Sequence, residues 1–222
     1  MKNKIRVLFV YPNKEGYPII LLGISVLSGV LKKEGHETDL FDVTFMMSER
    51  LNHDASEKTG LVEKVEMEKF LGAGDSVDID EAFKRKIAAF KPDLIAFSIV
   101  ENNYLCAKNL FMIAREASNV PIIVGGLFPT IEPDFFIKDD NVDLICVGEG
   151  EYAIAELAKR LGSGEDISDI PNLIVKKDGK IIKNGFSKYY DWNPLIFQDW
   201  EIFDKRHLLK PFMGMMQRTG FF

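Results

Sequence analysis

Cysteine, histidine and long apolar runs are all scarce in this sequence. Its 222 residues include two cysteines, Cys106 and Cys146, and three histidines. Two cysteines so far apart exclude a disulfide framework and a cysteine-bound metal cluster within these residues. The histidines share no spacing typical of metal ligands: His36, His53 and His207. The sequence therefore predicts neither a metal ligand nor a catalytic residue.

No apolar run reaches the roughly 18 residues that a membrane-spanning helix needs. The first run, residues 5–11, ends at once in Pro12 and Asn13, which is not the pattern of a signal peptide. The 28 basic and 34 acidic residues give a net charge of −6, which argues against a nucleic-acid-binding surface. We therefore expect a cytoplasmic protein that binds neither nucleic acid nor a membrane.

Short apolar runs alternate with helical patterns along most of the chain, which is typical of βαβ units. The runs predict strands at residues 5–11, 37–43, 93–100, 120–124 and 142–147, and the spacing of apolar residues predicts helices at 18–33, 80–90, 104–117, 132–138 and 151–161. Such alternation indicates an α/β fold with a doubly wound parallel sheet. We expect five strands in the flavodoxin-like order 2-1-3-4-5.

Two stretches fall outside this pattern. Residues 44–79 are highly charged and poorly periodic, which is typical of a solvated insertion after the second strand. Residues 173–182 predict a β-hairpin that turns at Asp178-Gly179, and an aromatic-rich segment follows it. We therefore divide the chain into a domain at residues 1–165 and a hairpin with linker at residues 166–222.

Ligands of open α/β sheets bind beyond the carboxyl ends of the strands. A Gly-Gly pair and a Gly-Glu-Gly sequence follow two successive strands, and glycine lets a ligand approach the backbone closely. A slot lined by Ser98, Gly125, Gly126 and Gly148 would admit a flat or slender group. The candidate cofactor-binding residues at these strand ends are Tyr11, Pro12, Asn13, Ser98, Ile99, Val100, Asn102, Gly125, Gly126, Phe128, Pro129, Thr130, Gly148, Glu149 and Gly150.

Motifs for other chemistries are missing. The sequence has no G-x-G-x-x-G after the first strand, no P-loop and no nucleophile elbow. Glu149 and Glu151 have the chemistry of an acid–base pair, but carboxylates in the first turn of a helix also suit the helix dipole.

Five segments, in this order and spacing, resemble the N-terminal cobalamin-binding domain of B12-dependent radical SAM enzymes. They are LFVYP at 8–12, GHE at 35–37, KPDLIAFS at 91–98, IVGG at 123–126 with Pro129-Thr130, and VGEGE at 147–151. The resemblance covers about residues 5–165. It implies that the corrin lies on the carboxyl edge of the sheet and that its dimethylbenzimidazole tail enters the slot at Ser98, Gly125, Gly126 and Gly148. Phe128, Pro129 and Thr130 would then flank the tail, the loop from Tyr11 to Gly16 would face the lower side of the corrin, and Val147 would join the site.

The sequence differs from known cobalamin enzymes in two motifs. The loop after the first strand reads PNKEGY at 12–17, without the histidine that ligates cobalt in D-x-H-x-x-G domains, so the resemblance implies base-off binding with no His ligand. The sequence also lacks the C-x-x-x-C-x-x-C motif for a [4Fe–4S] cluster. We therefore expect a chain cut before the radical SAM barrel, where the cluster and S-adenosylmethionine would bind. The chain alone would not be catalytic, and the full-length protein would be a methyltransferase-like enzyme whose own radical SAM domain is a partner of this module.

Two alternatives remain at this point. One is a flavodoxin-like docking or regulatory domain with no cofactor. The other is a nucleotide-binding enzyme domain with a phosphate at Gly148-Glu149-Gly150, which is disfavoured because Glu149 and Glu151 would repel phosphate.

Overall fold

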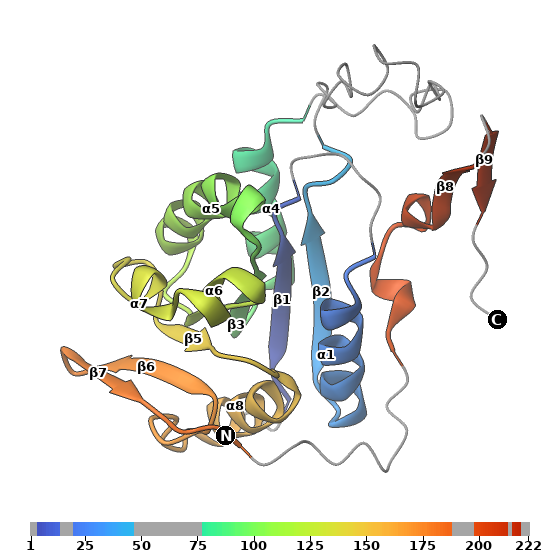
Figure 1. The fold of residues 1–222 in the computed structure, drawn as a ribbon. Coiled ribbons are helices and arrows are strands. Elements are labelled where there is room, and N and C mark those ends of the chain that lie inside the picture. Colours follow the sequence, from blue (N-terminus) through green and yellow to red (C-terminus); the bar gives the residue numbers. More distant parts are fainter. Residues whose placement is uncertain (1–3, 14–19, 47–76, 188–197, 213–214, 219–222) are drawn as a thin grey trace.

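The computed structural model describes residues 4–13, 20–46, 77–187, 198–212 and 215–218 of the chain. Its centre is an α/β sandwich around a mostly parallel sheet (Figure 1). The sheet has seven strands in the order β2-β1-β3-β4-β5-β6-β7. Their bounds are β1 Arg6–Tyr11, β2 Glu37–Asp42, β3 Leu94–Ser98, β4 Ile122–Gly125, β5 Leu144–Cys146, β6 Leu173–Lys177 and β7 Lys180–Lys183.

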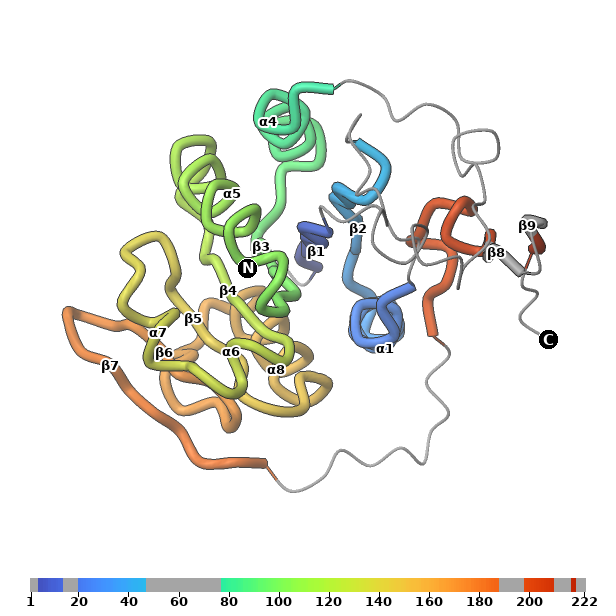
Figure 2. Tube along the Cα trace, turned by 45° about the horizontal axis from the view of Figure 1, so that its top comes forward, coloured from blue at the N-terminus to red at the C-terminus, as the bar shows by residue number. Residues whose placement is uncertain are grey.

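The helices cover both faces of the sheet, as Figure 2 shows. Helices α4 (Ile79–Phe90) and α5 (Tyr104–Ala117) pack on one face, while α1 (Leu22–Lys33) and α8 (Glu151–Ser163) pack on the other. Two short helices, α6 (Leu127–Ile131) and α7 (Pro133–Phe136), follow β4. This is the doubly wound arrangement that alternating strands and helices predict.

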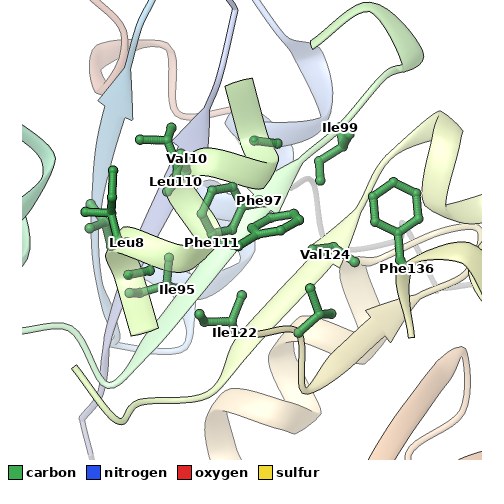
Figure 3. Close-up of a cluster of buried hydrophobic side chains, with 14 of the residues drawn as sticks. Leu8, Val10, Ile95, Phe97, Ile99, Leu110, Phe111, Ile122, Val124 and Phe136 are labelled. Carbon is green, nitrogen blue, oxygen red and sulfur yellow. The ribbon is translucent and has the colours of Figure 1, made fainter. Parts of the chain in front are cut away.

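Alternate residues of each central strand supply two separate cores. On β1, Leu8 and Val10 face α4 and α5, whereas Val7 and Phe9 face α1 and α8. Figure 3 shows the first core, in which Phe97 from β3 and Phe111 from α5 meet edge to face with ring centroids 4.7 Å apart. Strands buried on both faces explain the nearly continuous apolar runs of the sequence.

The hairpin at β6 and β7 corrects the expected strand count. Strand β6 pairs antiparallel with β5, so the hairpin extends the main sheet from five to seven strands. Leu173, Ile174 and Val175 of β6 are buried, which gives the hairpin a share of the core. Strand β7, which reads Lys-Ile-Ile-Lys, then forms the outer edge, where its two exposed lysines discourage pairing with another chain.

The segment after the hairpin returns to the opposite edge of the sheet. It contains two single-turn helices, at Trp200–Ile202 and Lys205–Leu208, and the antiparallel pair β8 (Leu209–Phe212) and β9 (Met215–Arg218). His207 is fully buried, and its Nε2 lies 2.5 Å from a carboxylate oxygen of Asp42 at the end of β2.

Most element boundaries differ from expectation by one to three residues, and the largest difference follows β4. The helix expected at 132–138 is shorter, α7 at Pro133–Phe136, and the sequence interpretation missed α6 before it; the two are separate because Glu132 leaves helical geometry before Pro133 starts the next turn. Most of the expected insertion, residues 47–76, lies outside the described residues. None of the helices in the described ranges is long and apolar enough to cross a membrane.

Candidate functional site

A cavity of about 220 Å³ opens at the carboxyl edge of the sheet. Its floor comes from the ends of β1, β3, β4 and β5, and its walls come from α1 and α8. The loop between β5 and α8 completes the rim with Gly148, Glu149 and Gly150. This is the place where open α/β sheets bind their ligands.

The structure brings six of the candidate residues together in the cavity lining: Ser98, Gly125, Gly126, Gly148, Glu149 and Gly150. Ser98 and Gly125 are partners in the register of β3 and β4, so they lie side by side at the end of their strands. The other candidates lie outside the lining. Thr130 is near the rim, where its hydroxyl accepts a hydrogen bond of 3.0 Å from the Gly148 backbone N–H.

The candidates at the end of β1 and just after it are not part of the cavity lining. Tyr11, Pro12 and Asn13 are buried, and the Asn13 amide donates a hydrogen bond of 3.1 Å to the Thr44 hydroxyl after β2. Gly16 lies outside the described residues.

The candidates that follow β3, β4 and β5 but do not line the cavity differ in burial. Ile99 is a core residue, Val100 and Asn102 are exposed before α5, and Pro129 is buried in α6. Phe128 packs against Phe136 at 5.0 Å between ring centroids, and Val147 packs against the same core. None of these residues is part of the cavity lining.

The glycines of the lining have two different roles. Gly126 has φ +105°, and a Cβ there would lie 2.6 Å from the Ile99 carbonyl oxygen, so backbone packing requires glycine at this position. A Cβ at Gly125 would make an ordinary 3.5 Å contact with the Cβ of Cys146. Glycine at 125 therefore keeps space open rather than relieving a clash.

The apolar walls of the cavity were missed by the sequence interpretation. Residues that face a ligand from a helix or from inside a strand carry the same apolar pattern as core residues, so only packing distinguishes them. The additional lining residues are Phe9, Gly23, Ile24, Leu27, Ala96, Phe97, Ile123, Cys146, Glu151 and Ile154.

Two lining residues carry unusual electrostatics. Burial raises the pKa of the Cys146 thiol to about 12, and the negative charge of Glu151 adds to this effect. Oε2 of Glu151 is buried and has no hydrogen-bond partner. Among the described residues, no group of three His, Cys, Asp or Glu side chains is placed to hold a metal ion.

The described histidines lie away from the cavity. The Nδ1 of His36 accepts a hydrogen bond of 3.3 Å from the Ile5 backbone N–H at the opposite end of the sheet. His207 is enclosed beside Phe45 and Phe203. His53 lies outside the described residues.

A doubly wound sheet with a glycine-rimmed, apolar cavity at its carboxyl edge defines a cofactor-binding α/β domain. The profile of one family, the B12-binding domain, matches residues 13–158. The match covers more than half of the chain, and the chain belongs to this family. The resemblance drawn from the sequence is thereby confirmed.

Similar curated proteins are longer than this chain. The anaerobic magnesium-protoporphyrin IX monomethyl ester cyclase of Synechocystis is 28% identical over 109 residues, which are 47% of this chain and 22% of the relative. An uncharacterized methyltransferase of Pyrococcus horikoshii is 28% identical over 43% of this chain and 21% of its own length. The chain thus spans under a quarter of these relatives.

Solved structures of cobalamin-dependent enzymes share the fold. The radical S-adenosylmethionine methyltransferase TsrM from Kitasatospora setae, with cobalamin and a [4Fe-4S] cluster bound, has a TM-score of 0.63 and 18% identity over 98% of this chain and 31% of that chain. The cobalamin-dependent S-adenosylmethionine radical enzyme OxsB, with aqua-cobalamin bound, has a TM-score of 0.62 and 17% identity over 90% and 24% of the two chains. The chain is therefore a B12-binding domain that resembles those of cobalamin-dependent radical SAM enzymes.

Proposed function

We propose that this chain is the cobalamin-binding module of a cytoplasmic radical SAM enzyme and that it holds the corrinoid base-off, with no histidine ligand to cobalt. The observation that carries the proposal is the cavity between the ends of β3, β4 and β5 and helices α1 and α8. The parallel strands have the order β2-β1-β3-β4-β5, which places this cavity where flavodoxin-like domains bind cofactors.

The residues of the cavity suit the lower base of cobalamin, a flat bicyclic aromatic group. The walls are mostly apolar, with side chains such as Phe9, Leu27 and Ile154. Gly125 leaves free space beside Cys146, which favours a flat ring between strands. The polar groups of the lining are few, as is usual in a site that takes an apolar ligand and fixes its orientation.

No histidine is among the described residues that line the cavity, which supports base-off binding without a protein ligand. Loop residues 12–17 contain no histidine, and His36 and His207 are bound up elsewhere in the fold. When bound, cobalamin supplies a cobalt atom that carries and passes on a methyl group. This chain would bind and orient the corrinoid, while the cluster and S-adenosylmethionine would belong to a radical SAM domain of the full-length enzyme.

Absorption titration with hydroxocobalamin tests the proposal. We expect the wild-type chain to bind with a base-off spectrum at concentrations below about 100 μM. Gly125→Leu should abolish this binding because its side chain extends into the cavity. Ala88→Leu is the matched control, since Ala88 is exposed on α4.

Failure of the wild-type chain to bind would overturn the proposal and favour a docking domain without cofactor. Equal binding by Gly125→Leu and wild type would show that the corrinoid does not use this cavity. Circular dichroism of both variants would establish that they fold.

A further inference from the structure

Glu151 lines the cavity and has one buried carboxylate oxygen, Oε2, without a hydrogen-bond partner. It is the first residue of α8 and belongs to the cavity lining. Its Oε2 is out of contact with solvent and accepts no hydrogen bond within the described part of the chain. A buried polar atom without a partner is costly, so such an atom in a residue that lines a ligand cavity calls for a partner on the ligand.

Among the described residues that line the cavity, none is a cation that would compensate Glu151. The other titratable groups of the lining are Cys146 on β5 and Glu149 in the following loop. Helix α1 contributes only glycine and apolar side chains to the lining, and β1, β3 and β4 contribute no charged group. The start of α8 favours a negative charge at Glu151, but it leaves the lone pairs of Oε2 unused.

The lower base of cobalamin has the complementary group. Its ring nitrogen, which binds cobalt in the base-on form, carries a free lone pair once the base is detached. A carboxylate and a ring nitrogen are both acceptors, so they pair only when one proton is shared between them. We propose that Glu151 is the group that holds this ring nitrogen, through one shared proton. The inference rests on the proposed function and adds the residue that recognises the base.

Two consequences follow from the shared proton. The bond occupies the nitrogen that would otherwise return to cobalt, so Glu151 favours the base-off form. At pH values where neither the carboxylate of the free protein nor the base of the free corrinoid is protonated, binding takes up one proton from solution. The dissociation constant then rises about tenfold for each unit by which the pH rises. Ser98 is the competing partner, because its neutral hydroxyl could donate to the nitrogen with no proton uptake.

The experiment compares two corrinoids that differ in the lower nucleotide. Methylcobalamin carries the base on its ribose phosphate, and methylcobinamide lacks this whole group, whose phosphate does not titrate in the range tested. For the wild-type chain between about pH 6 and pH 9, we expect methylcobalamin affinity to fall as pH rises and methylcobinamide affinity to stay level. Absorption titration and calorimetry in two buffers of different ionisation enthalpy measure affinity and proton uptake independently.

Two variants separate the polar contact from the shape of the cavity. Glu151→Gln keeps the shape and supplies an amide N–H, so it should bind methylcobalamin with no pH dependence. Glu151→Leu should weaken methylcobalamin binding by tenfold or more and leave methylcobinamide unchanged. Glu165→Gln is the matched control, because Glu165 is exposed beyond the other end of α8.

The outcomes distinguish this inference from the proposed function. If the wild-type chain binds neither corrinoid, the proposed function fails. If its affinity for methylcobalamin does not change with pH and Ser98→Ala lowers that affinity, Ser98 is the partner of the base and the inference is wrong. An unchanged ratio of methylcobalamin to methylcobinamide affinity in a folded Glu151→Leu variant also overturns it.

Discussion

Gly125 and Gly126 are neighbours in the chain but meet different constraints. The backbone at Gly126 turns with positive φ and packs against Ile99, whereas Gly125 ends β4 beside open space. A sequence pattern marks both as small and places both at the strand end. It does not separate a glycine that the backbone needs from one that leaves room for a ligand, because that difference depends on a neighbouring strand.

The two positions should therefore respond differently to alanine. We expect Gly126→Ala to lower the free energy of unfolding by about 1–3 kcal/mol, because the added Cβ meets the Ile99 carbonyl and the backbone conformation is strained for alanine. Gly125→Ala should change it by about 0.5 kcal/mol or less. Urea denaturation followed by circular dichroism measures both values, and equal losses would contradict this division of roles.

Whole elements were predictable where one signal dominates. The central strands are continuous apolar runs, and Asp78 caps α4 by accepting from the backbone N–H groups of Asp80 and Glu81, so these elements lie close to their expected ranges. The hairpin was also expected as an element. Its pairing with β5 was not, because an antiparallel partner for the last parallel strand leaves no periodic signal in the sequence.

The segment after residue 198 is held to α1 by Asp199, a contact that spans most of the chain. The Asp199 carboxylate accepts from the Ser28 hydroxyl at 2.6 Å and lies 2.6 Å from the Lys32 ammonium. The Asp199 side chain is only 8% exposed, so these bonds are shielded from water. Its backbone N–H also donates to the Ser25 carbonyl at 2.9 Å.

Asp199→Ala should loosen this segment without unfolding the sheet. We expect faster cleavage by trypsin at Lys205 and Arg206, and a free energy of unfolding lower by about 1–3 kcal/mol, because the variant removes the hydrogen bond from Ser28 and the ion pair with Lys32. Limited proteolysis with mass spectrometry locates the cuts. Glu201→Gln, an exposed change in the same segment, is the control and should match wild type. Cleavage at the wild-type rate in Asp199→Ala would show that other contacts hold the segment.

The two ends of the parallel strands have different roles in the molecule. The carboxyl ends leave a cavity open, whereas hydrogen bonds at the amino ends secure the strands. His36 lies at the amino ends, where it links the chain before β1 to the end of α1. Its ring accepts a hydrogen bond from the Ile5 backbone N–H, and its own backbone N–H donates to the Leu31 carbonyl at 2.9 Å. Protonation of Nδ1 would remove the bond to Ile5, so it should act on global stability.

Stability of the whole chain should therefore depend on the charge of His36. Burial lowers the pKa of His36 below its ordinary value of 6.5, although the charge of Glu34 opposes this shift. The unfolded chain then binds a proton at a higher pH than the folded chain, so stability is complete above about pH 6.5 and declines as pH falls below it. Urea denaturation from about pH 7.5 down to pH 5 should show this decline in wild type and a smaller one in His36→Gln, which retains an acceptor but does not titrate. The comparison isolates His36 because the other titrating groups are common to both proteins. If the free energy of unfolding of the two proteins fell in parallel with pH, His36 would not be the source of the decline.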